Sequence, residues 1–150
     1  MGKKRIIKKS EQELLEEREK IEAAVKKDIK TKASGRIREG RIYIFSSYNN
    51  TIISLTDPQG NVLVQKGAGG IGFKGTKKGT PFAAAKVAEF ISEAAKKIGI
   101  NRVEVFVKGV GAGRDSALRS LAARGIDFLR IKDVTPIPHD GCRPPRPRRV

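Results

Sequence analysis

Soft metal ligands and long apolar runs are scarce in this sequence. Its 150 residues include one cysteine, Cys142, and one histidine, His139. A single cysteine excludes an intrachain disulfide, and two such side chains are too few for a structural zinc site. No apolar run approaches the roughly 18 residues of a membrane span, and the N-terminus lacks the apolar stretch of a signal peptide. We therefore expect an intracellular protein without a membrane partner or a bound metal.

Acidic residues are also few. The chain has 16 Asp and Glu against 32 Lys and Arg, which gives a formal net charge of +16. This balance makes a neutral-surfaced metabolic enzyme a poor fit. It predicts attraction to a polyanion, most often nucleic acid and less often an anionic membrane face.

Groups suited to catalysis are few as well. His139 lies between Pro138 and Asp140, with no serine or cysteine elbow that it could activate. The carboxylates are scattered, and we assign Asp57 to a turn and Asp115 to a helix cap. We therefore expect no enzymatic activity, no cofactor and no small-molecule substrate.

Composition divides the chain into three segments. Residues 1–40 form a basic arm and a charged helix, for which Ser10 and Glu13 have the spacing of a capping box. The thin apolar stripe of that helix is more typical of a solvated helix than of one docked on a partner, and both interpretations stay open. Residues 41–134 form one globular domain. Residues 135–150 form an extended tail rich in proline and arginine, which cannot bury apolar surface.

The globular segment has the patterns of five strands and two helices. Thr80 and Pro81 begin the longer helix as its N-cap and first residue, and Gly99 ends it. The order βββαβαβ predicts an α/β fold with a mixed five-stranded sheet and helical cover. Strands are expected at 41–46, 51–56, 62–66, 102–107 and 128–134, and helices at 81–98 and about 115–124.

Two glycine-rich loops, at 67–79 and 108–114, each follow a strand and precede a helix. Residues 70–75 match G-x-G-x-x-G, but the helix begins only at Pro81, too far on to hold a pyrophosphate at its N-terminus. The residues after Gly75 are not the lysine and serine or threonine of a P-loop. Glycines let backbone N–H groups approach phosphates, and the nearby lysines add positive charge. Together the two loops predict a surface for an RNA or DNA backbone.

Aromatic residues make up only 5% of the chain. The core is the expected place for the phenylalanines of the apolar runs, which are Phe45, Phe90, Phe106 and Phe128. Tyr48 in a hairpin and Phe73 in the first glycine loop are candidates for stacking on bases. No strand carries the aromatic pattern of an RNA-recognition motif. Binding should therefore depend on phosphates and shape, with few bases read.

Four ordered motifs resemble one known family. They are the runs 47–51, 72–84, 108–114 and 133–145, so the likeness covers about residues 41–150. These motifs resemble the small-subunit ribosomal protein eleven family, and the last is closest to its bacterial form. The resemblance implies a ribonuclease-H-like sheet without nuclease activity. It also implies a structural protein of the small-subunit platform, in cytoplasmic ribosomes, that binds small-subunit rRNA and neighbouring platform proteins near the mRNA exit path and takes part in translation.

The resemblance, taken position by position, implies rRNA contacts in the hairpin, both loops and the tail. In the hairpin and loops these are Asn49, Asn50, Thr51, Lys74, Lys77, Lys78, Arg114 and Ser116. In the tail, Arg143, Arg146, Arg148 and Arg149 would thread between RNA segments. Lys66 beside the first loop and His139 before the tail are further candidates from the charge pattern.

Two departures from the family pattern matter. Residues 1–40 are longer and more acidic than the family's usual basic arm, which leaves their partner open. Asp140 precedes Gly141 where the family commonly has Asn-Gly. Glycine leaves the attacking backbone nitrogen unobstructed, so a succinimide forms readily. We therefore expect an isoaspartate at Asp140.

The residues alone leave two other functions open. The glycine loops and strand order also suggest a nucleotide-using or metal-dependent nuclease, although the P-loop lysine is missing and the acids are scattered. The composition also allows a free-standing DNA-architectural protein. A tail of proline and arginine suits a fixed, folded RNA better than sliding on a duplex.

Overall fold

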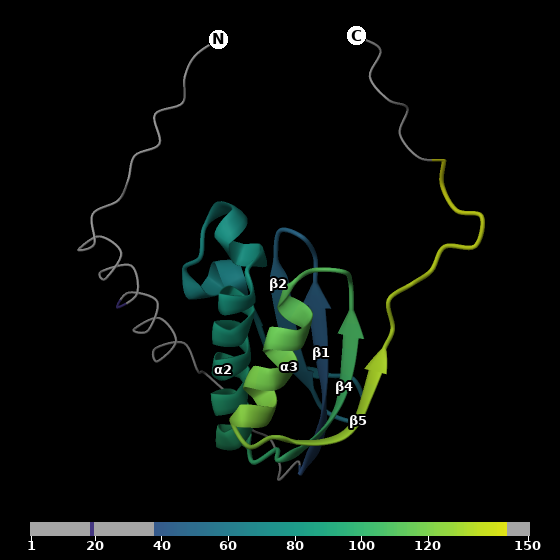
Figure 1. The fold of residues 1–150 in the computed structure, drawn as a ribbon. Coiled ribbons are helices and arrows are strands. Elements are labelled where there is room, and N and C mark those ends of the chain that lie inside the picture. The colour runs from purple at the N-terminus through teal and green to yellow at the C-terminus, as the bar shows by residue number, and fades with distance from the viewer. Residues whose placement is uncertain (1–18, 20–37, 144–150) are drawn as a thin grey trace.

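A five-stranded sheet with two helices on one face forms the domain (Figure 1). The structure is a computed structural model that describes Glu19 and residues 38–143. The helix expected in the first forty residues and the tail beyond Arg143 lie outside that range. The strands are β1 (Glu39–Ser46), β2 (Thr51–Thr56), β3 (Val62–Gly67), β4 (Arg102–Lys108) and β5 (Asp127–Asp133), and the helices are α2 (Pro81–Ile98) and α3 (Gly113–Ala123).

The strand order is β3-β2-β1-β4-β5. Strands β1, β2 and β3 form an antiparallel meander, whereas β4 pairs in parallel with both β1 and β5. The predicted mixed sheet with the order of a ribonuclease-H-like fold is therefore confirmed.

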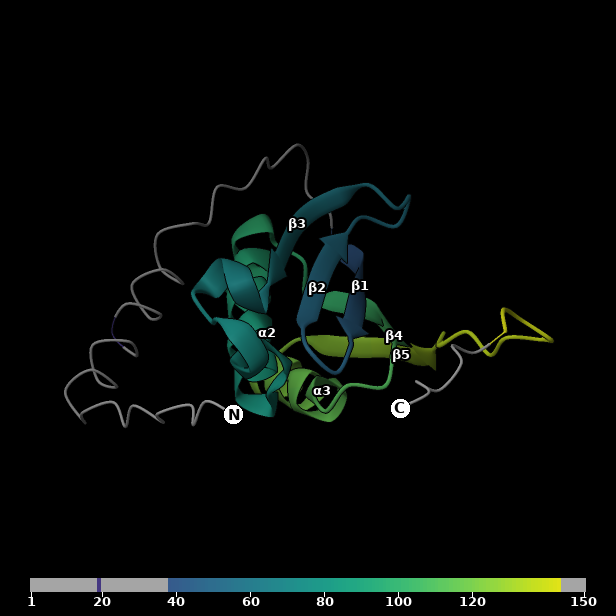
Figure 2. The same ribbon diagram turned by 90° about the horizontal axis from the view of Figure 1, so that it is seen from above.

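Handedness explains why both helices lie on the same face. The crossover from β3 through α2 to β4 and the one from β4 through α3 to β5 move across the sheet in the same direction. Parallel crossovers are right-handed in nearly all proteins, so both helices must lie on one side. Figure 2 shows this helical layer beside the twisted sheet. Within residues 38–143, no element covers the other face.

The core lies between the helices and the sheet. Alternate residues of β1, such as Ile42 and Ile44, are buried, as are Val87 and Ile91 of α2. Small residues let α2 and α3 approach closely: Gly113 of α3 lies so near Ala84 of α2 that a Cβ on Gly113 would be 2.8 Å from the Ala84 Cβ. Neither helix in the described part of the chain is long and apolar enough to cross a membrane.

The ends of α2 are as predicted, whereas the start of α3 is not. The Thr80 hydroxyl accepts a hydrogen bond from the Ala83 N–H at 3.3 Å, and Gly99 ends α2 in the left-handed region at φ 94°. The assignment of Asp115 as a cap of α3 is wrong. That helix begins at Gly113, and Asp115 lies within its first turn, where the positive end of the helix dipole stabilises its negative charge.

Three aromatic expectations are also wrong. Phe106, expected in the core, is only half-buried and stacks on Tyr43 on the sheet face away from the helices. Phe45 is 44% exposed, because strand alternation turns it away from the helices together with Tyr43. Phe73, expected to be available to bases, is only 8% exposed and packs edge-on against Phe82 at 5.9 Å. Tyr48 in the hairpin is exposed, as expected.

Candidate nucleic-acid interface

The basic loops gather at one end of the sheet. Strands β1, β3, β4 and β5 all run in the same direction, so their carboxyl ends meet there. The segments that follow these strands are 47–50, 68–80, 109–112 and 134–143, and we call them the loop end. Figure 1 shows them at the top of the molecule, and Figure 2 looks down on them.

Glycines let these loops lie against the β1–β2 hairpin. The Gly111 N–H donates to the Ser46 carbonyl at 2.9 Å. A Cβ on Gly109 would lie 2.1 Å from that same oxygen, and one on Gly79 would lie 2.2 Å from the Tyr48 carbonyl. No larger residue fits at either position without backbone movement. The glycine loops and the hairpin therefore form one continuous surface.

The lysines of the first loop lie on two short turns before α2. The turns are η1 (Ala68–Ile71) and η2 (Gly75–Gly79). Lys74 and Lys77 are exposed and Lys78 is half-buried. The Thr80 hydroxyl donates to the Lys77 carbonyl at 2.7 Å while it caps α2. The lysines are thereby held beside the positive end of a long helix, an arrangement that favours phosphate.

Arg114 fastens the second loop to β5. Its guanidinium donates to the Gly109 carbonyl and to the Asp133 carboxylate. The Thr135 hydroxyl and backbone N–H also donate to Asp133, at 2.6 and 2.9 Å. These hydrogen bonds, the Thr135 hydroxyl first, lower the pKa of Asp133 to about 2. The predicted contact Arg114 is thus part of a hydrogen-bonded clamp between the loop and the start of the tail.

The other predicted residues differ in how far they reach the surface. Asn49 is exposed, whereas the Asn50 Oδ1 is buried without a hydrogen-bond partner among residues 38–143. Thr51 is fully buried, and its hydroxyl lies 3.4 Å from that of Ser46. The Lys66 ammonium lies 5.0 Å from the centre of the Phe90 ring.

Ser116 is half-buried and donates to the Gly113 carbonyl within α3 at 3.2 Å. In the tail, His139, Asp140 and Arg143 are exposed. The remaining predicted residues, Arg146, Arg148 and Arg149, lie outside the described residues.

Two exposed cations beside the loop end are not among the predicted RNA contacts, although Lys108 was counted in the second glycine loop. Lys108 ends β4, and Lys132 lies near the carboxyl end of β5. Both lie at the carboxyl ends of parallel strands, and the rule that such ends share one edge of the sheet could have found them. Groups of three or more His, Cys, Asp or Glu able to hold a metal are absent from the described part.

These features define a class of protein: a small α/β domain that presents cations and helix N-termini at the carboxyl ends of its strands, suited to polyanions. A family model described as Ribosomal protein S11 matches residues 40–149, which include nearly all of β1 and every later element. The chain belongs to the Ribosomal protein S11 family. Members are structural proteins of the small subunit of cytoplasmic ribosomes, not enzymes; they bind rRNA and other ribosomal proteins and take part in translation.

Proposed function

We propose that the loop end and the tail are the surfaces that bind small-subunit rRNA, and that they fix the RNA of the platform beside the mRNA exit path. The observation that carries the proposal is the gathering of four segments at the carboxyl ends of four strands, with Lys74, Lys77, Lys78, Lys108, Lys132 and Arg143 in them or beside them. Family membership supports rRNA as the polyanion. The platform and its neighbouring proteins come from the motif resemblance.

Lys74, Lys77 and Lys78 contact the RNA backbone in this proposal, helped by the N-terminus of α2. Asn49 and Asn50 reach RNA from the hairpin. The tail arginines from Arg143 onward thread between RNA segments, with His139 beside them. These contacts position the RNA and read few bases, because most of the side chains are cations suited to phosphate.

The remaining predicted residues act mainly by positioning. Thr51 is buried beneath the hairpin, and Lys66 packs over an aromatic ring of α2. Arg114 and Ser116 hold the start of α3, and Arg114 offers RNA its remaining N–H groups. Substitution of any of these four residues should therefore act mainly by changing the conformation of the loops, and less by removing a direct phosphate contact.

Competition binding tests this function. The purified chain is bound to labelled small-subunit rRNA at about 0.15 M salt, and unlabelled small- or large-subunit rRNA is then added. We expect the small-subunit RNA to compete at far lower concentration, because folded RNA must match the arrangement of all four segments. Equal competition by the two RNAs would contradict the proposal, since it would leave only non-specific charge attraction.

We also propose that Asp140 becomes isoaspartate. The residue is exposed and has a φ of 53°, the left-handed conformation that Asp tolerates better than most residues. The modification does not change mass, so the tryptic peptide of the native protein is compared by chromatography with a synthetic peptide containing ordinary Asp. We expect a shifted elution, and coelution would refute the modification.

A further inference from the structure

The tip of the β1–β2 hairpin presents an aromatic ring to solvent. Tyr48 is 80% exposed, and within residues 38–143 its ring makes no aromatic contact and its hydroxyl no hydrogen bond. Single exposed apolar side chains are common on protein surfaces, so exposure alone indicates no ligand. The setting of Tyr48 is what distinguishes it.

The backbone that carries Tyr48 is held within the turn and from both sides. The Ser47 N–H donates to the Asn50 carbonyl at 2.9 Å, and the Ser47 hydroxyl accepts from the Asn50 N–H at 3.2 Å. A Cβ on Gly79 would lie 2.2 Å from the Tyr48 carbonyl oxygen, and one on Gly111 would lie 2.3 Å from the Ser47 carbonyl oxygen. The turn is therefore fixed between the two glycine loops. A ligand of the ring meets a backbone that is already ordered, which lowers the entropic cost of binding.

A polar amide and cations surround this tip. Asn49 follows Tyr48 and is exposed, and its side chain offers both a donor and an acceptor. Lys77 and Lys78 directly precede Gly79, the residue that packs on the tip. Phosphates bound by these lysines would bring the bases of the same strand close to the Tyr48 ring. Proteins recognise unpaired nucleotides with this combination of aromatic ring, hydrogen-bonding side chain and positive charge.

The ring selects unpaired bases over bases in a helix. Inside an RNA helix both faces of each base are covered by its neighbours in the stack, and the major groove is too deep and narrow for side chains to read. A base in a loop or bulge has a free face and costs little to stack on a protein ring.

We propose that Tyr48 and Asn49 bind one unpaired base of the small-subunit rRNA. The Tyr48 ring stacks on the face of the base, and the Asn49 amide hydrogen-bonds to its edge. This inference rests on the proposed function, and it adds a contact that does not depend on charge. Stacking of one base changes affinity by roughly 5- to 160-fold. Phosphate contacts instead determine the salt dependence, so a salt series separates the two contributions.

Filter binding of the full chain to small-subunit rRNA provides the first test. Tyr48→Ala should weaken binding roughly 5- to 160-fold at every salt concentration and leave the slope of log K against log salt unchanged. Tyr48→Phe keeps the ring and should bind like the unmodified chain. Unchanged affinity or a changed slope in the Tyr48→Ala protein, or an equal loss in the Tyr48→Phe protein, would overturn the stacking. Asn49→Ala should also lower affinity at constant slope, and unchanged affinity would remove Asn49 from the site.

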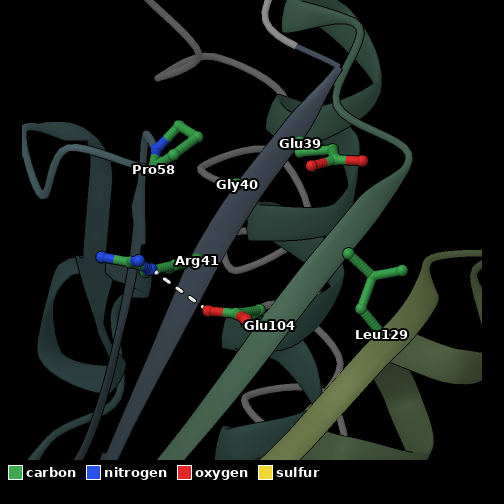
Figure 3. Close-up of a pocket in the computed structure, with 6 residues that line it drawn as sticks. All are labelled: Glu39, Gly40, Arg41, Pro58, Glu104 and Leu129. Carbon is green, nitrogen blue, oxygen red and sulfur yellow. Dashed lines mark hydrogen bonds and ion pairs between the residues drawn. The ribbon is translucent and has the colours of Figure 1, made fainter.

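A control position lies at the opposite end of the sheet. A hollow of about 390 Å³ there has Arg41, Glu104 and Leu129 in its lining (Figure 3). The Arg41 Nε lies 3.2 Å from the Glu104 Oε2, so these two charges are paired within the domain. Leu129 is 53% exposed and lies far from the loop end. It is therefore a surface position without the combination of groups found at the tip.

Tryptophan fluorescence provides the second test, because the chain has no tryptophan of its own. Tyr48→Trp places a single indole at the tip, and stacking on a base quenches indole fluorescence. We expect small-subunit rRNA to quench the Tyr48→Trp protein and to leave the Leu129→Trp control unchanged. A fully paired RNA duplex, which offers phosphates but no unpaired base, should not quench either protein. No quenching at the tip, equal quenching in the control, or quenching by the duplex would each contradict the binding of an unpaired base.

The outcomes separate this inference from the proposed function. Equal competition by small- and large-subunit rRNA for the unmodified chain would overturn the function itself. A chain that prefers small-subunit rRNA, and keeps its full affinity in the Tyr48→Ala variant, would overturn only the stacking.

Discussion

Replacing Lys74, Lys77 and Lys78 with alanine should weaken RNA binding without unfolding the domain. Two of the three side chains are exposed, and η2 contains no buried residue. The Thr80 hydroxyl is held by the Lys77 carbonyl, which alanine also provides. The substitutions therefore remove charge and leave in place the backbone that forms the loop.

The size of the effect follows from counterion release. Each lost phosphate contact should reduce the slope of log K against log salt by roughly 0.7–0.9. Loss of three contacts then reduces the slope by about 2.1–2.7. With equal affinities of the two proteins at about 1 M salt, the variant binds roughly 50- to 170-fold more weakly than the unmodified chain at about 0.15 M salt. A smaller change would mean that fewer than three of these lysines reach phosphates.

Filter binding to small-subunit rRNA across a salt series measures both quantities. The matched control replaces Lys96 and Lys97, which lie in the last turn of α2 at the far end of that helix. The control should keep the original slope. An unchanged slope in the triple variant would refute backbone binding by this loop, and an equal change per lysine in the control would show that only overall charge matters.

The remaining predictions concern the scaffold. Gly109→Ala should lower the free energy of unfolding, measured in urea, by roughly 2–4 kcal/mol, because the new Cβ clashes with backbone at a φ of +104°. The control Gly60→Ala, at φ +101° with open space around it, should lower it by only about 1–2 kcal/mol. Similar losses in the two variants would contradict the close packing of the loop. The pKa of Asp133, measured by NMR, should be about 2 rather than its ordinary 3.8. The contribution of this carboxylate to stability is therefore complete above about pH 4 and is lost as the pH falls through 2. A pKa near 3.8 would contradict the clamp with Thr135. Removal of residues 1–38 should leave RNA affinity largely intact in filter binding, and a large loss would show that this segment binds RNA itself.

Most of the fold could be predicted from local patterns. The turn at Asp57 has a local cause, since its carboxylate accepts hydrogen bonds from the Gln59 and Asn61 N–H groups, both at 2.9 Å. The cap at Thr80 and the stop at Gly99 likewise depend on residues a few positions away. Such interactions are visible in a sequence because both partners lie in the same short window.

The errors arose where distant parts of the chain decide the outcome. Phe45 lies in an apolar run, yet it is exposed because both crossovers place their helices on the other face of the sheet. Arg114 stays a predicted phosphate contact, but no local pattern indicates its hydrogen bond to Asp133, which is 19 residues away. Thr51 stays a predicted rRNA contact, but the sequence does not show that it is fully buried beneath the hairpin. The type of each residue indicates the chemistry available at these positions, but it does not indicate which other residues lie beside them in the fold.

Sedimentation of the native protein in a lysate gradient tests the central claim most directly. Because the proposed function has folded rRNA engage several segments of the chain at once, we expect the protein to comigrate with small subunits at moderate salt and to remain with them after a high-salt wash. A protein that stays at the top of the gradient, or leaves the subunits as soon as salt is raised, would contradict a structural role in the small subunit.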